Sequence, residues 1–167
     1  MTELFSSFPG KTERYQEQST EPKLVSLNDV LQHALLAYQQ AIKKGDLVIR
    51  TEVLPAVLAD RQQINLLIQN ALGLIITEKT GVGKQFVHVD CNAMDDEVMD
   101  LSIQNGFRRF QLNFKTNIKC GAIAEQNEQQ LQQCAAILQH LNGKISVNDN
   151  EEQKCWLKIF LPGKFLS

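Results

Sequence analysis

Few side chains in this chain are of types that catalyse reactions or bind metals. Their spacing in the sequence does not indicate that any of them form a common site. The candidates are three histidines, four cysteines and a run of adjacent carboxylates: His33, His88, His140, Cys91, Cys120, Cys134, Cys155 and Asp95-Asp96-Glu97. The cysteines form no Cys-x-x-Cys pair and have no histidine at metal-ligand spacing, so we expect reduced, mostly buried thiols rather than a zinc site or disulfides. Adjacent carboxylates at a polar turn do not converge on one point, so this cluster is typical of a solvated loop.

The histidines and the one glycine-lysine pair also have ordinary interpretations. We expect His33 and His140 on helices and His88 in a strand, as surface or partly buried side chains. Gly83-Lys84 is followed by Gln85 and lacks the glycine five positions earlier that a phosphate-binding loop requires. The sequence therefore predicts no nucleophilic grouping with histidine, no metal site and no P-loop.

Length and composition are those of one globular domain. The chain has 167 residues, of which 43% are hydrophobic and 22% charged, and about 100–200 residues usually form one domain. Its 17 Lys and Arg residues stand against 19 Asp and Glu residues, a formal net charge of −2. Without a basic excess we expect no nucleic-acid partner. No apolar run approaches the roughly 20 residues that span a bilayer, and the N-terminus has no signal-peptide pattern, so we expect a cytoplasmic protein.

Periodicity divides the chain into a leader and one folded domain. Residues 1–23 show neither helical nor alternating apolar spacing and are expected to be a flexible polar leader, with the domain at 24–167. Ser26 or Asn28 can cap the first helix, and Asp60 the second. The helices are expected at 27–42, 60–75 and 125–139, and the strands at 47–53, 86–91, 98–104, 110–114, 144–148 and 154–161.

The order of these elements predicts an α+β fold. Residues 86–91 are expected to form a hairpin with 98–104, and residues 144–148 a hairpin with 154–161, while 110–114 is a short extra strand. Strands joined by hairpins, with long amphipathic helices between them, indicate a two-layer α/β sandwich. We expect a mixed, mostly antiparallel sheet with three helices on one face.

Four short strings, in this order, resemble the ATP-binding catalytic domain of sensor histidine kinases, within the GHKL ATPase family. Residues 27–31 (LNDVL) are similar to the family's opening helix, and residues 54–61 (LPAVLADR) to the segment that leads into its second helix. Residues 138–147 (LQHLNGKISV) resemble its helix-to-strand corner, and residues 160–162 (FLP) its final strand. The resemblance spans about residues 26–163 and implies the Bergerat-type fold of histidine kinase ATPase domains.

The resemblance also implies a nucleotide site, but its metal-binding motif is incomplete in this chain. Family members carry two asparagines four residues apart on one face of the second helix, and the later one ligates the Mg²⁺ that bridges the ATP phosphates. These positions fall on Asn70 and Leu74, and a leucine cannot coordinate a hard cation. A second register puts the metal-binding asparagine at Asn70 and the first asparagine at Leu66. Either register keeps only one asparagine of the pair.

Both glycine-containing boxes of the family also depart from their pattern. The Asp-x-Gly-x-Gly box, whose Asp binds the adenine amino group, falls on residues 104–108, from Gln104 to Arg108, where only Gly106 is retained. The box that wraps the phosphates falls on residues 128–131, which have no glycine and place Glu128 where polyphosphate would lie. Losing the adenine hydrogen bond, the metal ligand and the glycine cradle costs about 4–6 kcal/mol, enough to turn a micromolar site into one weaker than millimolar.

The expected function is that of a non-catalytic pseudokinase domain, a protein-interaction or regulatory module in two-component signal transduction. ATP binding is expected to be lost, with no cofactor, no metal and no catalytic residue. Asn70, Leu74, Gln104 and Gly106 are the vestigial nucleotide-site positions. The expected partner is a protein such as a histidine kinase or a response regulator, or a second copy of the chain.

Two alternatives stay open. The first is a divergent GHKL ATPase or sensor histidine kinase domain that still binds ATP with Mg²⁺. The second is a phosphotransfer or scaffold component whose helical hairpin is supplied by another chain.

Overall fold

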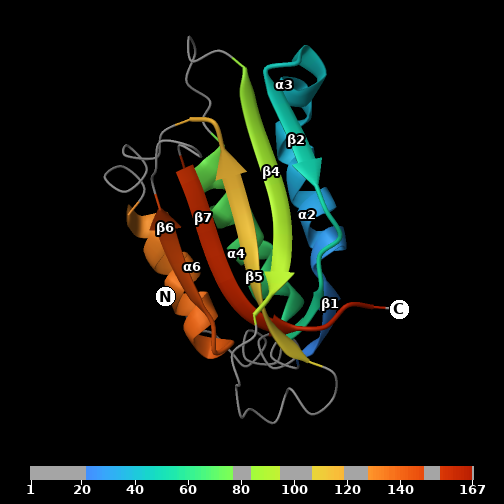
Figure 1. Cartoon of the computed structure of the whole chain (residues 1–167), viewed down its shortest axis with the longest axis vertical. Helices are drawn as coiled ribbons and strands as arrows, with labels where there is room; N and C mark the ends of the chain where they lie inside the picture. Colours follow the sequence, from blue (N-terminus) through green and yellow to red (C-terminus); the bar gives the residue numbers. More distant parts are fainter. Residues whose placement is uncertain (1–21, 77–83, 95–106, 119–127, 149–154, 167) are drawn as a thin grey trace, which may run out of the picture.

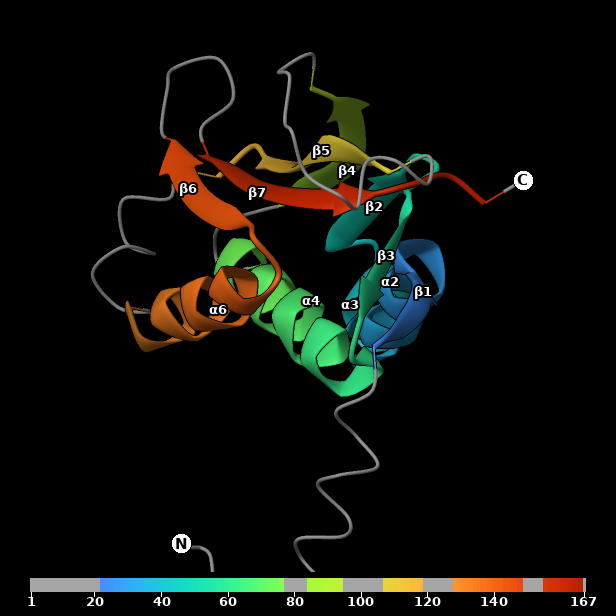
Figure 2. The ribbon, with the colours of Figure 1, turned by 90° about the horizontal axis from the view of Figure 1, so that it is seen from below.

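A five-stranded sheet and a layer of helices make up the fold (Figures 1 and 2). The structure is a computed structural model and describes residues 22–76, 84–94, 107–118, 128–148 and 155–166. In spatial order the strands are β2 (Leu47–Thr51), β4 (Gln85–Ala93), β5 (Arg108–Thr116), β7 (Cys155–Gly163) and β6 (Lys144–Asn148). The β2–β4 pair is parallel and the other three pairs are antiparallel.

The helices of the described residues lie together on one face of this sheet (Figure 2). They are α2 (Leu27–Leu35), a 3₁₀ turn η1 (Leu36–Tyr38), α3 (Gln39–Lys44), α4 (Arg61–Ile75) and α6 (Glu128–His140). Helix α4 lies in the middle of the layer, between α2 and α6 (Figure 2). The expected α+β sandwich, with a mixed, mostly antiparallel sheet covered on one face, is confirmed.

The core forms where the apolar stripe of α4 meets the inward side chains of the sheet. The six stripe residues are at most 2% exposed: Ile64, Leu67, Ile68, Ala71, Leu72 and Ile75. Their spacing of three and four residues puts them on one helical face, and they pack with inward residues such as Phe114 and Leu157. The amphipathic pattern in the sequence therefore identified this helix and its buried face.

The expected N-caps of the first two helices are confirmed, but the first helix is interrupted, and the expected start of the third at residue 125 lies outside the described residues. The Ser26 hydroxyl accepts a hydrogen bond from the backbone N–H of Asp29 (3.3 Å), and the Asp60 carboxylate accepts one from that of Gln62 (3.0 Å). Gly45 ends α3 with a φ of 82°, in the left-handed region that glycine adopts without strain. Between these ends, the 3₁₀ turn η1 separates α2 from α3. It contains neither proline nor glycine, so no residue type marked the break.

The strand that pairs with β4 differs from the expected hairpin. The residues expected to form a short extra strand are part of β5, a nine-residue strand that pairs with both β4 and β7. Over 87–89, one edge of β4 is bonded to β2 and the other to β5. The expected partner strand at 98–104 lies outside the described residues. The full length of β5 was not predicted because every second side chain in it is polar. These polar side chains lie on the outward face of the sheet.

Two short strands were not predicted. β1 (Lys23–Ser26) pairs antiparallel with β3 (Ala56–Ala59) to form a separate two-stranded ribbon. Ala56 also exchanges two backbone hydrogen bonds with Lys164, of 2.7 and 2.9 Å, and these join the ribbon to the end of β7. Four-residue strands are too short to show an alternating pattern. Of the leader expected at residues 1–23, residues 1–21 lie outside the described residues.

Candidate functional site at the seam of α4 and α6

The two vestigial positions on α4 are both buried. Asn70 is 7% exposed and Leu74, one turn later, is 2% exposed. Residues four apart share a helical face, and Leu74 belongs to the hydrophobic core. In the first register of the family motif, the magnesium-ligand position therefore holds an apolar side chain inside the core, whereas in the second register that position is Asn70 itself.

Helix α6 packs along α4 at these positions. The Asn70 amide Nδ2 donates a hydrogen bond to Oε1 of Gln133 on α6, at 3.1 Å. One turn along α4, a Cβ atom at Gly73 would lie 3.1 Å from the Gln130 amide nitrogen, so the Gln130 side chain lies against this glycine. Two glutamine side chains of α6 therefore contact α4, Gln133 at Asn70 and Gln130 at Gly73.

A buried cysteine lies in the same seam. Cys134 is fully buried, and its Sγ lies 3.9 Å from the backbone carbonyl oxygen of Leu67. Burial raises the pKa of the Cys134 thiol to about 11, because desolvation disfavours the thiolate. Burial and the neighbouring Asp90 carboxylate likewise raise the pKa of Cys91. Cys91 and Cys134 are free thiols, Cys155 is buried, and Cys120 lies outside the described residues. With their pKa values raised, neither the Cys91 nor the Cys134 thiol is activated for nucleophilic attack at neutral pH.

The C-terminal end of α4 is closed by a polar network that the sequence did not reveal. Gln85 donates through Nε2 to the Ile75 carbonyl oxygen (2.8 Å) and to the Thr116 hydroxyl (2.9 Å). Asn117 accepts a hydrogen bond from the Phe86 N–H (2.9 Å) and donates one to the Lys84 carbonyl oxygen (3.2 Å). Gln85 and Thr116 are 3% and 5% exposed. The alternation of inward residues along β4 and β5 could have placed both side chains on the covered face.

Of the predicted adenine box at 104–108, only Phe107 and Arg108 belong to the described residues, and both lie at the opposite end of the sheet from Leu74. Gln104 and Gly106 lie outside the described residues, but Phe107, which follows Gly106, immediately precedes β5. The first residue of β5 pairs with Gly163, which packs against residues 55–57 near the start of α4. β5 is nine residues long, about 30 Å, and ends at Thr116 beside the other end of α4. Thr116, rather than Phe107, shares an end of the sheet with Leu74.

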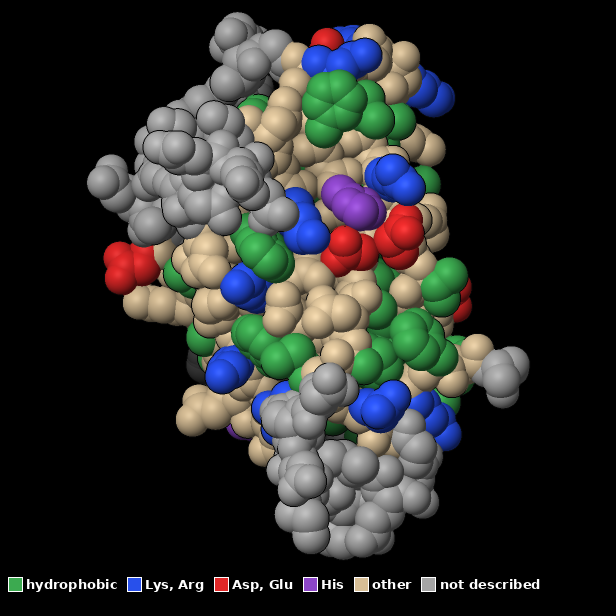
Figure 3. Space-filling model, in the orientation of Figure 1, with side chains coloured by type: hydrophobic (Ala, Val, Ile, Leu, Met, Phe, Trp, Pro, Cys, Tyr) green, Lys and Arg blue, Asp and Glu red, His purple; other side chains and the backbone are tan. Residues whose placement is uncertain are grey.

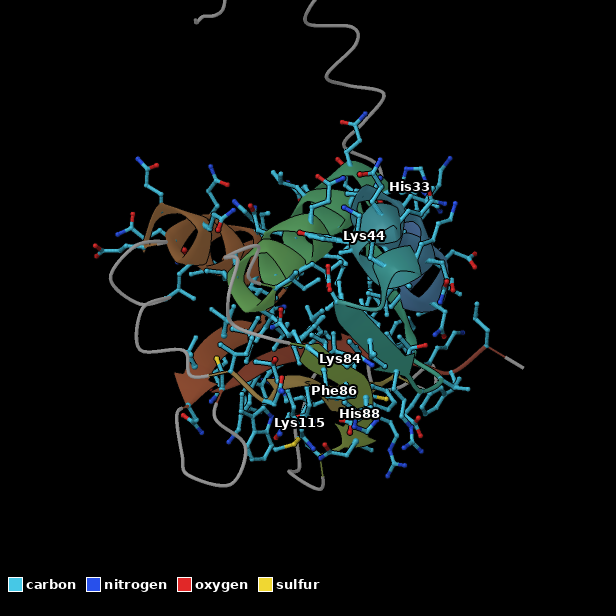
Figure 4. The ribbon with its side chains drawn as sticks, turned by 90° about the horizontal axis from the view of Figure 1, so that it is seen from above. His33, Lys44, Lys84, Phe86, His88 and Lys115 are labelled. Atoms are coloured by element: carbon cyan, nitrogen blue, oxygen red, sulfur yellow. The ribbon has the colours of Figure 1, made fainter. Side chains whose placement is uncertain are left out.

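The remaining candidate residues stand apart from this seam. His33 and His140 are exposed on helices, and His88 is half-buried on β4, as expected (Figure 4). The carboxylates at 95–97 lie outside the described residues. Glu128 lies in the first turn of α6, where its charge opposes an anion. Among the described residues, no group of three His, Cys, Asp or Glu side chains is placed to hold a metal ion.

Two described positions of this seam depart from the magnesium-nucleotide pattern of the family. Leu74 offers no oxygen ligand and Glu128 stands at the start of α6, whereas Asn70 donates to Gln133 through Nδ2, a bond in which its Oδ1 takes no part. Hard cations are bound by oxygen atoms, and polyphosphates require helix termini that lack negative charge. The seam of α4 and α6 is thus a packed helix interface in the described part of the chain.

Comparisons with known proteins define the fold. No family model and no curated protein matches the sequence. Among solved structures, the catalytic domain of histidine kinase ThkA is 15% identical over 87% of this chain and 99% of that chain, with a TM-score of 0.57. The mycobacterial sensor histidine kinase MprB is 14% identical over 88% of this chain and 99% of that chain, with a TM-score of 0.58. The ATP-binding domain of PrrB from Mycobacterium tuberculosis is 17% identical over 85% and 97%, with a TM-score of 0.56.

The helices give no sign of a membrane segment. None of those in the described part of the chain combines the length and apolar character needed to cross a bilayer. The likeness covers 85–88% of this chain in the three solved structures, so it includes most of the sheet and its helices. The chain has the GHKL-like fold of the ATP-binding catalytic domains of histidine kinases.

Proposed function

We propose that this chain is a non-catalytic, pseudokinase form of a histidine kinase ATP-binding domain, and that it acts as a protein-interaction or regulatory module in signal transduction. The observation that carries the proposal is the buried Leu74, 2% exposed, beside an Asn70 amide that is hydrogen-bonded to Gln133. A module of this kind needs no cofactor.

Binding of ATP at this seam would have an energetic cost. A ligand that accepts a hydrogen bond from the Asn70 Nδ2 must compete with Gln133 for it, and a net hydrogen bond is worth about 1 kcal/mol. It must also displace the Gln130 side chain from Gly73. Leu74 in the core contributes about 1.5–3 kcal/mol of hydrophobic stabilisation, which a polar metal ligand at that position would forfeit. These terms favour the packed seam over a nucleotide pocket.

The proposed partner is another protein of two-component signal transduction. A histidine kinase, a response regulator or a second copy of the chain would suit a domain that keeps the kinase fold without its nucleotide chemistry. The proposed location is the cytoplasm, where such partners act.

Calorimetric titration of the purified chain with ATP and with ADP, each with and without Mg²⁺ and up to millimolar nucleotide, tests the loss of ATP binding. We expect neither heat nor a thermal shift, and a catalytic domain that binds nucleotide serves as the positive control. Micromolar binding would overturn the proposal and favour the divergent ATPase. Asn70→Ala and an assay of phosphotransfer would then be the next experiments.

A further inference from the structure

The face of the sheet opposite the helices is not covered by any described element (Figure 2). Side chains alternate along each strand, so every second residue points away from the core. On β7 these outward residues are Trp156, Lys158, Phe160 and Pro162, between the buried Cys155, Leu157, Ile159 and Leu161. We call the outward side chains of β2, β4, β5, β7 and β6 the outer sheet face. Figure 3 shows hydrophobic and basic groups interspersed over it.

The charge of the outer sheet face is opposite to that of the whole chain. Five cationic side chains point outward from its strands: Arg50, Arg109, Lys115, Lys144 and Lys158. Two carboxylates accompany them, Asp90 on β4 and Glu52 directly after β2. Among the described residues, these five cations against two carboxylates leave +3 on this face, whereas the whole chain carries −2. An acidic partner is therefore attracted to the outer sheet face rather than to the rest of the domain.

The positive charge is compensated on only one side of this face. Near β2 and β4, Glu52 lies 3.6 Å from Arg50, and Asp90 lies 3.5 Å from Lys115. His88 lies 3.7 Å from each of these carboxylates. On β6 and β7, neither Lys144 nor Lys158 has a carboxylate within salt-bridge distance in the ranges that the structure describes. In this part of the chain, the two lysines without a carboxylate neighbour thus lie on β6 and β7, while Lys115 on β5 has Asp90 beside it.

Aromatic rings hold these lysines in place. The ammonium groups of Lys158 and Lys115 lie 4.2 and 5.0 Å from the centre of the Trp156 ring, and that of Lys144 lies 5.1 Å from the centre of the Phe160 ring. The Trp156 indole nitrogen donates a hydrogen bond to Asn113 at 2.8 Å, which fixes the ring on the sheet. Side chains ordered before binding lose less entropy when a partner arrives, and tryptophan is common at the energetic centre of interfaces.

A shallow pocket adjoins this cluster. It has a volume of about 400 Å³ and is lined by residues that include Val48, Phe86, His88 and Lys115. Phe86 is 50% exposed and Val48 37% exposed, so its apolar part is open to solvent. Figure 4 shows Phe86, His88 and Lys115 close together on the sheet, on the side away from His33 and Lys44. Lys115 borders both this pocket and the Trp156 ring. An apolar residue next to acidic residues could use the two sites together.

We propose that the outer sheet face binds an acidic segment of a partner protein, with carboxylates on Lys115, Lys144 and Lys158 around Trp156 and an apolar side chain in the pocket at Phe86. This inference rests on the proposed role as a protein-interaction module, but it does not depend on the loss of ATP binding. A single-stranded nucleic acid fits less well, because lysines lie over the ring of Trp156, where bases would stack.

Trp156 is the only tryptophan of the chain, so its fluorescence reports directly on this surface. The full chain is titrated with a synthetic peptide that alternates glutamate and serine around one leucine. The matched control peptide carries glutamine in place of glutamate, and oligouridine of similar length serves as the nucleic-acid probe. We expect the glutamate peptide alone to change the fluorescence, and its affinity to fall roughly tenfold at high salt because the charges are screened.

A pair of charge-matched variants tests the location. Anisotropy of a labelled glutamate peptide is measured with the double variant Lys115→Gln, Lys158→Gln and with the control Lys43→Gln, Lys44→Gln, whose lysines are exposed on α3. We expect at least a roughly tenfold loss of affinity, about 1.4 kcal/mol, in the first variant and little change in the second. Equal losses, tighter binding of oligouridine, or no binding of the glutamate peptide would each overturn the inference. None of these outcomes alters the nucleotide titration, which tests the loss of ATP binding separately.

Discussion

The side-chain amide of Asn70 on α4 donates a hydrogen bond of 3.1 Å to Gln133 on α6, across 63 positions of the sequence. The family resemblance assigns Asn70 to a nucleotide site, yet here its amide joins two helices. Leu74, one turn further along α4, lies in the hydrophobic core. An asparagine kept from a binding motif can therefore serve the packing of the domain.

A double-mutant cycle on Asn70 and Gln133 measures this role. Asn70→Ala and Gln133→Ala should each lower the free energy of unfolding, and their coupling energy should be about 0.5–1.5 kcal/mol because they share one hydrogen bond. Urea unfolding of the four proteins gives the coupling. Gln132→Ala, an exposed residue next to Gln133, is the matched control and should show no coupling to Asn70→Ala. Additive effects at Asn70 and Gln133 would mean that the bond is not formed in solution.

Gly73 tests how closely α6 packs on α4. A Cβ atom at this position would lie 3.1 Å from the end of the Gln130 side chain, which is flexible and can move. Alanine is favoured over glycine inside a helix by about 1 kcal/mol, so we expect Gly73→Ala to stabilise the domain by up to that amount in thermal unfolding. Gly73→Leu should destabilise it by about 1–3 kcal/mol, because the larger side chain forces the helices apart. If Gly73→Ala destabilises the domain instead, the Gln130 side chain cannot move away from the added methyl group.

The sequence predicted those parts of the fold whose apolar spacing is regular. The stripe of α4 and the alternation of β6 and β7 follow from burial on one face, and burial is what the spacing of apolar residues records. The alternation of Phe110, Leu112 and Phe114 predicts only a short strand, whereas β5 extends further, to include Arg109 and Lys115. Both lie on its uncovered face, where charged side chains remain in contact with solvent.

The candidate site was only partly predictable, because its main contacts join distant parts of the chain. Helical spacing placed Asn70 and Leu74 on one face of α4, but nothing local identifies Gln133 as the partner of Asn70. The network of Gln85 and Thr116 joins residues 31 positions apart. Such contacts depend on how the strands are ordered in the sheet. The expected hairpin paired β4 with a strand at 98–104, whereas the structure pairs it with β5.

Gln85 tests the polar network at the end of α4. Gln85→Met keeps the size of the side chain but leaves the Ile75 carbonyl and the Thr116 hydroxyl without this buried donor. We expect a loss of about 2–4 kcal/mol in the free energy of unfolding, since buried polar groups that lose a partner are costly. Thr116→Val should lower the free energy of unfolding less in the Gln85→Met background than in the unmodified chain. In that background the Thr116 hydroxyl has already lost its donor, so removing it takes away an unsatisfied group. Chemical denaturation of the three variants decides this, and independent effects would contradict the network.

Cys134 predicts a loss of stability at alkaline pH. Burial raises its pKa from 9.0 to about 11, so the folded chain holds the thiol proton over a range in which the unfolded chain releases it. The unfolded state then binds fewer protons, and the free energy of unfolding falls as the pH rises through this window. The stabilisation is fully present below pH 9.0 and is lost by about pH 11. This rise in the pKa of Cys134 corresponds to roughly 2–3 kcal/mol in the free energy of unfolding. Cys134→Ala removes this titration while leaving Cys91 and the lysines as they are. Unfolding of both proteins across this range should show their stability difference shrinking, and parallel profiles would mean that the Cys134 thiol titrates normally.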